Sequence, residues 1–265
     1  MGVKVESKND LVSSVARTMS ILESLGKADM LSLTEIARGC GLHKSTAFRF
    51  LQTLLQLGYV FRDEAGDRYG LSLKLNALAG IRSGSRDILR YAASSLDFLS
   101  RETGETIHLA VLEDGNLIYL RKIESHRVLR VATMTSSVGG GAPLYCTGLG
   151  KAVLAFFPLQ EQEHYIAHQV FARFTANTIT DGPALLAELA LIREQGYAFD
   201  RQEHEEGVVC AAAPIFGSGQ LPLGAISIAG PSVRMGEEEL KRYTALILEA
   251  SREISAKLGL IEHSP

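Results

Sequence analysis

The sequence predicts an α+β fold in two domains, a small N-terminal winged helix-turn-helix and a larger domain with an antiparallel sheet flanked by helices. Helical periodicity runs through residues 12–57 and is broken by a Gly-rich turn. Two short β-prone runs follow at once, as in a hairpin. Beyond residue 104 the strands come as neighbours, not as regular βαβ units. We therefore expect domains at 11–75 and 88–262, joined by a linker at 76–87.

Composition narrows the class of protein. Of 265 residues, 46% are hydrophobic and 22% charged, which is ordinary for a soluble protein with packed cores. The sequence has no apolar run of about 18 residues and no secretory signal at its polar start, so we expect a cytoplasmic protein with no membrane partner. Cys40, Cys146 and Cys210 fit neither a disulfide framework nor a zinc site. We expect no metal and no cofactor.

Charge is unevenly distributed along the chain. The net charge is −3, yet residues 1–85 hold 11 Lys and Arg against 8 Asp and Glu. No acidic residue occurs between Glu35 and Asp63, although four basic residues do: Arg38, Lys44, Arg49 and Arg62. A segment that approaches phosphates should exclude carboxylates in this way, although a gap of this kind also arises by chance.

The first helix should cover residues 12–26, with its buried face formed by Val15, Met19, Leu22 and Leu25. Ser32 is a good N-cap for the second helix, and Glu35 three residues later completes a capping box. That helix should end near 39–41, and the third should run from His43–Lys44 to Leu57, where Gly58 stops it.

The third helix divides by face. Its inward positions are Ala47, Leu51, Leu54 and Leu55, and its outward stripe is Ser45, Arg49, Gln52 and Gln56. Two helices around a tight turn, the second with hydrogen-bonding and cationic residues outward, indicate a helix-turn-helix. The runs 59–62 and 68–71 flank a turn and predict a wing. The alternative is a three-helix bundle with an incidental hairpin.

This arrangement predicts a DNA-binding face. We expect Ser45, Thr46 and Arg49 to contact bases and Lys44 to contact phosphate, with Arg62 and Arg68 of the wing on the backbone or in the minor groove. The remaining predicted DNA-binding residues are Ser32, Phe48 and Gln52. Two-fold symmetry of a homodimer then predicts a palindromic operator in double-stranded DNA.

The second domain begins after a short helix at 73–81 and an apparent hinge at 82–87. An amphipathic helix should run from 88 to 101 and end at Gly104. The expected strands are 105–114, 116–125, 128–134, 196–201, 208–216 and 222–230, and the expected helices begin at 148, 160, 183 and 237.

The segment PLYCTGLGKAVLAF (143–156) carries the strongest chemical signal. A Gly-rich turn leads into a helix N-terminus, which favours a bound anion, although an ordinary capped turn gives the same pattern. It is not a nucleotide P-loop, because Tyr145 and Ala152 stand where that motif needs Gly and Ser or Thr.

Polar residues interrupt the apolar strands that follow. Asp200, Cys210 and Ser227 either satisfy backbone groups or line a pocket for a small carboxylate. The carboxylates between Asp200 and Glu206 are better explained as a solvated surface than as metal ligands. The chain has neither a G-x-S-x-G elbow nor an HExxH motif, so we expect no catalytic residues.

Four ordered segments resemble the IclR family of bacterial transcription regulators: GLHKSTAFRFLQTLLQLGYV, DRYGLSLKL, PLYCTGLGKAVLAF and DRQEHEEGVVCAAAPIF. The resemblance covers about Leu11 to Leu258. It implies a GAF-like effector-binding domain, a homodimer of winged helices, and often a homotetramer built as a dimer of dimers. Within the family the sequence is most similar to repressors of pectin and sugar-acid catabolism, which implies a 2-keto-3-deoxy sugar acid, or a related keto acid or aldonate, as effector.

Carried over by position, the family's effector contacts fall on Gly148, Leu149, Asp200, Cys210 and Ser227, and its apolar pocket wall on Val131 and Met134. Two departures put the exact ligand in doubt. Ala229 stands where members often have a second Ser, and Gly139–Gly141 replaces a loop that is often basic.

We therefore expect a repressor whose operator binding changes when a small carboxylate binds and residues 80–103 shift the DNA-binding domains. The main alternative is a redox-sensing regulator that uses Cys146, beside a helix N-terminus, or Cys210. A thiol-dependent enzyme would leave the acid-free helix at 43–57 unexplained.

Overall fold

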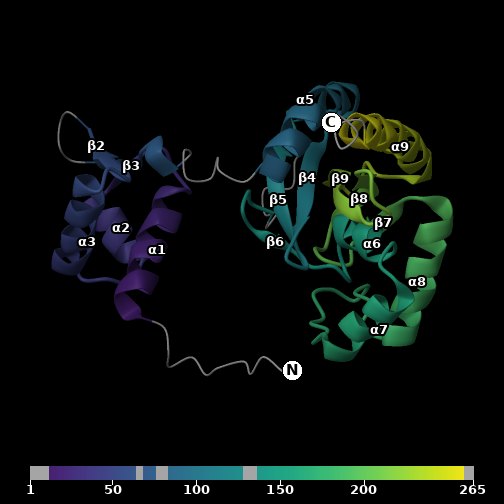
Figure 1. Cartoon of the computed structure of the whole chain (residues 1–265), viewed down its shortest axis with the longest axis horizontal. Coiled ribbons are helices and arrows are strands. Elements are labelled where there is room, and N and C mark those ends of the chain that lie inside the picture. The colour runs from purple at the N-terminus through teal and green to yellow at the C-terminus, as the bar shows by residue number, and fades with distance from the viewer. Residues whose placement is uncertain (1–11, 64–67, 76–82, 128–135, 260–265) are drawn as a thin grey trace. The chain divides into compact units, whose positions relative to one another are not determined.

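The computed structural model describes residues 12–63, 68–75, 83–127 and 136–259 (Figure 1). The chain forms two compact units, one ending at residue 83 and the other beginning at residue 84. They are called here the N-terminal unit and the C-terminal unit. The domain and linker bounds expected from the sequence stay predictions.

In its described residues, the N-terminal unit packs three helices against a small antiparallel sheet. Its helices are α1 (Ser13–Leu25), α2 (Leu33–Gly39) and α3 (Lys44–Gln56), and its strands are β1 (Leu31–Ser32), β2 (Val60–Arg62) and β3 (Arg68–Leu71), in the order β1-β3-β2. The core consists of Ile21, Leu25, Ile36, Leu51, Leu54, Val60 and Tyr69. The two-residue strand β1 was not expected, because it is too short to show a period.

The start of α2 is the predicted capping box. Ser32 Oγ accepts from Glu35 N at 3.3 Å, and the Glu35 carboxylate accepts from Ser32 N at 2.8 Å. The Ser32 hydroxyl also donates to Glu35 at 2.7 Å. The structure thus gives Ser32 the role of a helix cap, and the Ser32 contact with DNA stays a prediction.

The predicted buried face of α1 is wrong over its first half. Val15 and Met19 are 59% and 50% exposed, whereas Ile21 and Leu25 are buried. The small core reaches only the last two turns of the helix, so periodicity alone overestimated how much of it is covered.

The C-terminal unit has a six-stranded antiparallel sheet in the order β6-β5-β4-β9-β8-β7. Its strands are β4 (Thr106–Glu113), β5 (Asn116–Ile123), β6 (Gly141–Ala142), β7 (Ala198–Arg201), β8 (Val208–Phe216) and β9 (Pro222–Pro231). Its helices are α5 (Ser83–Thr103), α6 (Gly148–Leu154), α7 (Leu159–His168), α8 (Gly182–Gln195) and α9 (Glu237–Gly259).

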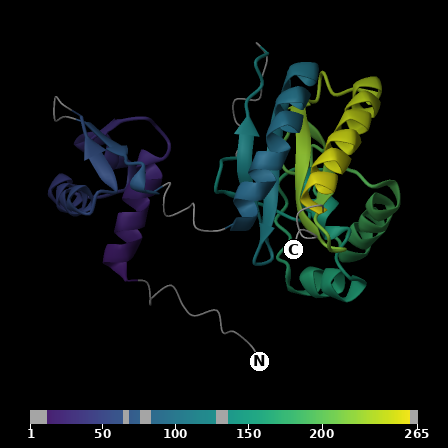
Figure 2. The same cartoon turned by 45° about the horizontal axis from the view of Figure 1, so that its top comes forward.

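Helices cover both faces of this sheet. In Figures 1 and 2, α5 and α9 lie on one face, and α6 and α8 lie on the other. Side-chain alternation along the strands separates the two cores: Ala211 and Ile228 pack in the core beneath α5 and α9, whereas Ala212 and Ala225 pack in the core with α6 and α8.

The boundary segment differs from expectation. Residues 83–87 were expected to form a hinge, but α5 begins at Ser83 and runs unbroken to Thr103. The buried positions Ile88, Ala92, Leu96 and Leu99 give α5 a continuous packed face, which outweighs the low helix propensity of one Gly and two Ser. The predicted helix at 73–81 lies mostly outside the described residues, as do the wing turn at 64–67 and the strand at 128–134.

Candidate functional site

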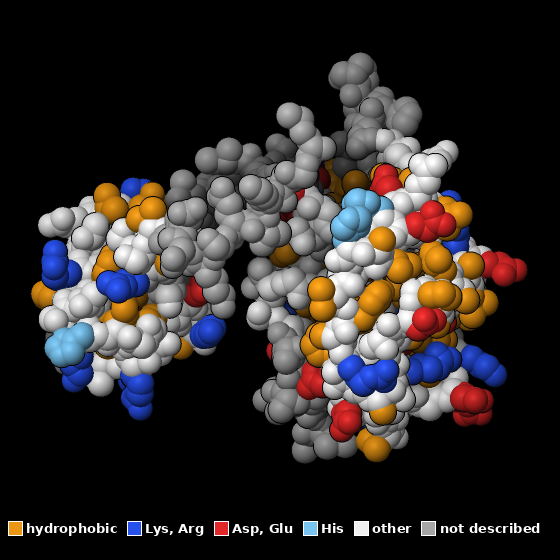
Figure 3. All heavy atoms as spheres, turned by 90° about the horizontal axis from the view of Figure 1, so that it is seen from below, with side chains coloured by type: hydrophobic (Ala, Val, Ile, Leu, Met, Phe, Trp, Pro, Cys, Tyr) orange, Lys and Arg blue, Asp and Glu red, His pale blue; other side chains and the backbone are white. Residues whose placement is uncertain are grey.

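The outer face of α3 is polar and cationic. Lys44, Ser45 and Arg49 are exposed, as is Phe48, and Thr46 and Gln52 are half-buried. Ala47, Leu51 and Leu54 on the opposite side are buried. The visible face of the N-terminal unit in Figure 3 carries mainly Lys and Arg among its charged side chains. The sequence thus gives α3 one face for the core and one that is free to contact a polyanion.

The two basic residues of the wing lie on neighbouring strands. Arg62 ends β2 opposite Tyr69, and Arg68 begins β3, where its carbonyl accepts from Asp63 N. The Arg62 guanidinium lies 5.4 Å from the centre of the Tyr69 ring. Both arginines remain exposed.

A pocket opens between the start of α6 and the sheet, and is called here the central pocket. It brings together five residues that the sequence singled out from four separate segments: Gly148, Leu149, Asp200, Cys210 and Ser227. The other lining residues are His108, Tyr119, Ser136, Thr147, His204, Glu205, Val208 and Ala229. Val131 and Met134 lie outside the described residues.

Strand register explains why these residues meet. Asp200 pairs with Cys210, and Cys210 pairs with Ala229, so the three lie in one row across β7, β8 and β9. Ser227 pairs with His108 of β4 in the adjacent row on the same face. Ala229, one of the two expected departures from the family pattern, therefore lies in the wall of the pocket.

Two glycines allow α6 to approach the sheet closely. A Cβ at Gly148 would lie 2.6 Å from Cys210 Sγ, and one at Gly150 would lie 2.3 Å from Pro143 O. Thr147 caps the helix by accepting from Gly150 N at 3.0 Å. Because α6 has only seven residues and part of its first turn is already capped, the glycines serve close packing at least as much as anion binding.

Asp200 is the most electrostatically perturbed carboxylate in the pocket. It is 5% exposed, and its Oδ1 accepts from Glu203 N at 2.7 Å. Burial, together with the nearby charge of Glu203, raises the pKa of Asp200 to about 7, against the opposing influence of that hydrogen bond and of Lys151. Asp200 can therefore present either a neutral carboxyl or a carboxylate near neutral pH.

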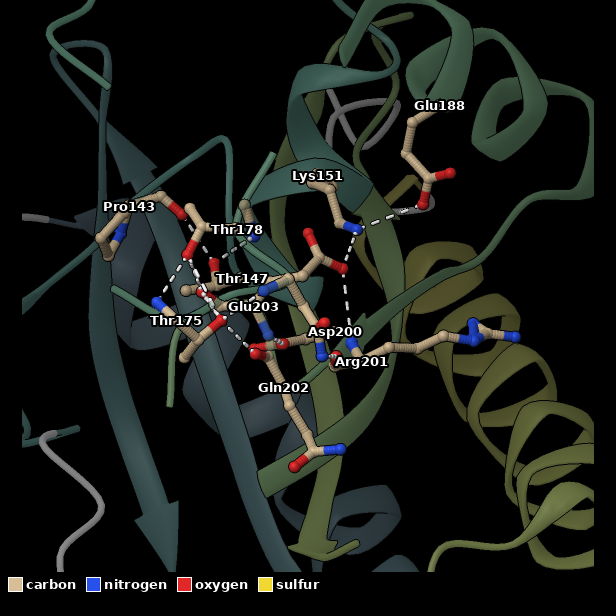
Figure 4. A network of polar contacts seen from close by, with 12 residues as sticks. Pro143, Thr147, Lys151, Thr175, Thr178, Glu188, Asp200, Arg201, Gln202 and Glu203 are labelled. Carbon is tan, nitrogen blue, oxygen red and sulfur yellow. Dashed lines mark hydrogen bonds and ion pairs between the residues drawn. The ribbon is translucent and has the colours of Figure 1, made fainter. Parts of the chain in front are cut away.

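A buried ion network lies next to Asp200 (Figure 4). Lys151 of α6 is fully buried, and its Nζ lies 2.5 Å from Glu203 Oε1 and 3.1 Å from Glu188 Oε1 of α8. Thr178 Oγ1 donates to Glu203 O at 2.7 Å, which fixes the turn between β7 and β8. The interpretation of this turn as solvated surface is wrong for Asp200 and Glu203, which are both 5% exposed.

The sequence analysis missed Lys151, His108 and Tyr119. A lysine within the apolar run GLGKAVLAFF was the available signal for the first, because such a side chain needs a buried counterion. His108 and Tyr119 lie among ordinary strand residues and gave no local signal. Among the described residues, no three His, Cys, Asp or Glu side chains come together as candidate metal ligands.

The surroundings of the cysteines disfavour the redox alternative. Cys146 lies beside a helix N-terminus, which would acidify a thiol, but burial raises its pKa to about 12. Burial also raises the pKa of Cys210, whose sulfur accepts from the backbone amides of Gly148 and Asp200. Desolvation outweighs the dipole of a short helix at both thiols.

Comparison with known proteins assigns both units to domain families. The IclR helix-turn-helix domain matches residues 14–64, and the C-terminal domain of the bacterial transcriptional regulator IclR matches residues 83–256. The chain is 38% identical to the HTH-type transcriptional regulator KdgR of Escherichia coli strain K12 over 96% of each chain. It is 36% identical to the DNA-binding transcriptional repressor YiaJ of the same strain, over 93% of this chain and 88% of that one.

A solved structure has the same architecture. The crystal structure of Thermotoga maritima IclR is 31% identical, covers 94% of this chain and all of its own, and superposes with a TM-score of 0.77. These matches confirm the α+β fold class, the family resemblance, and the prediction that the chain is not an enzyme. No helix among the described residues is long and apolar enough to cross a membrane. The chain belongs to the IclR family of bacterial DNA-binding transcriptional regulators.

Proposed function

We propose that this regulator is a repressor that releases its operator when a small carboxylate occupies the central pocket. The observation that carries the proposal is the convergence of Gly148, Leu149, Asp200, Cys210 and Ser227 on one cavity. They come from four separate elements, α6, β7, β8 and β9. A mostly apolar cavity with a few convergent polar groups is typical of a small-molecule site.

The operator is read by α3. Ser45, Thr46 and Arg49 contact bases in the major groove, and Lys44 contacts phosphate. Phe48 and Gln52 extend this face, and Arg62 and Arg68 contact the backbone or the minor groove. Exposure of the four charged residues supports this assignment. The protein acts in the cytoplasm, where bacterial DNA lies.

Replacing Arg49 with Ala should remove most of the specific binding. A bidentate contact between Arg and guanine contributes about 1–3 kcal/mol of discrimination, so operator affinity should fall about tenfold to hundredfold. Binding to non-specific DNA should change much less. The measurement is fluorescence anisotropy with operator and scrambled duplexes at one salt concentration.

Arg101→Ala is the matched control, because Arg101 is an exposed arginine at the end of α5 in the C-terminal unit. If Arg49→Ala bound the operator as tightly as the wild type, the recognition face would lie elsewhere.

The protein binds its palindromic operator as a homodimer, and two dimers form a tetramer. One observation supports self-association through the N-terminal unit. Val12 at the N-cap of α1 and Val15 and Met19 within the helix are 65%, 59% and 50% exposed. Such an apolar strip at the surface of a small unit favours burial against a second copy.

The effector is a 2-keto-3-deoxy sugar acid or a related keto acid or aldonate. Asp200 and Ser227 offer hydrogen bonds to carboxyl, keto and hydroxyl oxygens, and Leu149 and Val208 offer apolar contact. The pocket encloses about 40 Å³, which is room for about three water molecules. A ligand as large as a sugar acid must therefore extend past the mouth or move a wall. Only a ligand that prefers one conformation over another can switch the protein.

Thermal unfolding against small acids tests this assignment. The panel contains 2-keto-3-deoxygluconate, pyruvate, glyoxylate, simple aldonates and aromatic acids. A ligand present at about 100 times its Kd should stabilise the folded state by about 2.7 kcal/mol. The shift should vanish in Asp200→Ala and persist in Asp200→Asn, which keeps a neutral group able to donate. No shift with any sugar acid would exclude this ligand class.

The redox alternative has less support. The raised pKa of Cys146, about 12, keeps its thiol protonated at neutral pH, and Cys210 is likewise buried with a raised pKa. Thiolates are the reactive form, so neither residue has the environment of a redox sensor. A variant without cysteines that keeps its responses to ligand and DNA would exclude the alternative.

A further inference from the structure

His108 forms part of the wall of the central pocket, opposite Asp200. It lies on β4 and is 4% exposed. Its ring is 5.3 Å from the ring of Tyr119, at an interplanar angle of 53°. Neither residue belongs to the effector contacts carried over from the family motifs. Both line the pocket, so a ligand long enough to reach from Asp200 to β4 contacts them.

The imidazole joins two serine hydroxyls into one hydrogen-bonded chain. Nδ1 lies 3.3 Å from Ser227 Oγ, and Nε2 lies 2.9 Å from Ser136 Oγ. Both serines also line the pocket. The three side chains therefore form a continuous polar strip, called here the His108 strip.

The His108 strip carries no net charge. Burial and the nearby Lys122 ammonium lower the pKa of His108 to about 3, so the ring is neutral at physiological pH. A neutral imidazole has one donor and one acceptor nitrogen. With the proton on Nδ1, the ring donates to Ser227 Oγ, and the Ser227 hydroxyl is free to donate to a ligand. With the proton on Nε2, Ser227 donates to Nδ1, and its oxygen can accept from the ligand. The strip can thus bind a keto oxygen or a hydroxyl, and its three side chains carry no charge to attract a carboxylate. The ammonium of Lys122 donates to Ser136 O at 3.2 Å and is paired with Glu124 at 2.9 Å.

The sheet places the strip at a distance from Asp200. Asp200 lies on β7, Ser227 lies two strands away on β9, and His108 lies one strand further on β4. Adjacent strands are about 4.8 Å apart, and Ser227 is also two residues along the strand from the row of Asp200, so the two backbones are more than about 10 Å apart. A three-carbon acid held at Asp200 is too short to reach the strip as well, whereas a six-carbon acid can reach it.

We propose that His108, with Ser136 and Ser227, determines effector specificity by binding the hydroxyl-bearing tail of a six-carbon sugar acid whose carboxyl end lies at Asp200. The proposal rests on the function proposed above for the pocket. It assigns the two ends of the pocket to two parts of one ligand, and it explains why the far wall carries hydrogen-bonding groups without charge. Shorter keto acids then bind only at the Asp200 end.

A truncated ligand separates the two ends. Pyruvate has the same 2-keto carboxylate head as 2-keto-3-deoxygluconate but lacks its hydroxylated tail. His108→Phe keeps the aromatic volume against Tyr119 and removes both ring nitrogens. Its Kd for the sugar acid should rise about tenfold to hundredfold, because tail hydroxyls lose partners inside a desolvated site. Its Kd for pyruvate should stay within about twofold of the wild-type value, because none of the contacts to pyruvate is lost.

Three further variants make the result specific. His108→Gln keeps one donor and one acceptor and should recover much of the affinity for the sugar acid. Ser136→Ala cuts the strip at its half-buried end and should weaken sugar-acid binding alone, even if His108→Phe does not fold. His164→Phe is the matched control, because His164 is exposed on α7.

Calorimetric titration of each variant with both ligands distinguishes the outcomes. The assignment would be overturned if His108→Phe and Ser136→Ala lowered the affinity for both ligands equally, or for neither. The pocket would still be the effector site. A wild-type protein that binds neither ligand would overturn this inference together with the sugar-acid function.

Discussion

Replacing Lys151 with Met is expected to lower the free energy of unfolding of the C-terminal unit by about 3–5 kcal/mol at neutral pH. Lys151 is fully buried between Glu203 and Glu188. Its loss leaves the Glu203 carboxylate buried without a countercharge, and Glu203 Oε2 already finds no hydrogen-bond partner among the described residues. The loss of Lys151 destabilises the Glu188 carboxylate less, because the Glu188 side chain is 32% exposed and partly solvated.

Urea unfolding followed by circular dichroism measures the change. Lys257→Met is the matched control, because it removes a surface pair with Glu253 whose side chains are 36% and 51% exposed. That variant should lose less than about 1 kcal/mol. The double variant Lys151→Met with Glu203→Gln should recover most of the stability, because it removes the uncompensated charge.

The loss of stability in Lys151→Met should become smaller as the pH falls. Burial already raises the pKa of Glu203, so acidification protonates this carboxyl before an ordinary glutamate. The difference in stability between Lys151→Met and the wild type should therefore shrink as pH falls. A Lys151→Met protein as stable as the Lys257→Met control would contradict a supporting role for the network.

Binding of a carboxylate effector is expected to weaken about tenfold for each pH unit above about 7. The pKa of Asp200 in the folded protein is raised to about 7, mainly by burial. Below that pH the carboxyl is protonated and can donate to the ligand. Above it, two carboxylates meet in one desolvated site, so binding requires the uptake of a proton.

The groups around Asp200 do not reverse this sign. Glu203 raises its pKa, and Lys151 and the backbone amides of Glu203 and His204 lower it, with about 7 as the net result. Cys210 on β8 and Cys146 remain uncharged thiols because burial raises their pKa values. Among the described residues that line the pocket there is no Lys or Arg to balance a second negative charge.

Calorimetric titration with 2-keto-3-deoxygluconate from about pH 6 to about pH 9 measures the slope. Asp200→Asn imitates the protonated carboxyl and should bind with an affinity that is nearly independent of pH. Stability without ligand gives a second readout: from about pH 4 to about pH 7 the folded state holds a proton that the unfolded state has lost. The free energy of unfolding of the wild type should therefore fall over this range relative to Asp200→Asn. Parallel curves for the two proteins would contradict a raised pKa.

Local patterns in the sequence were sufficient to predict much of the fold. The spacing of Ala47, Leu51 and Leu54 predicted the buried face of α3, and Ser32 with Glu35 predicted the start of α2. The described helices and strands of the C-terminal unit began and ended close to the expected residues, apart from α5, which begins five residues early, and β6, which was not expected. These features depend on neighbours within a few positions, which periodicity and capping chemistry report directly.

Part of the site was also foreseeable. Asp200, Cys210 and Ser227 are polar residues in strongly apolar strands, and family resemblance connected them with Gly148 and Leu149. Sequence could not establish that they share one cavity, because this depends on the order of β7, β8 and β9 in the sheet. The exposure of Val15 and Met19 was missed for a related reason, since the extent of a core is not a local property.

The sequence by itself determined which faces of the helices and strands are apolar and where polar residues interrupt them. Only the tertiary structure decided which charges and nitrogens meet: Lys151 with Glu203, and His108 with Ser227, which are 119 positions apart. It also decided their protonation, raising the pKa of Asp200 and Cys146 and lowering that of His108. The physical reason is that desolvation and pairing depend on groups brought together by folding, and these carry no periodic signal along the chain.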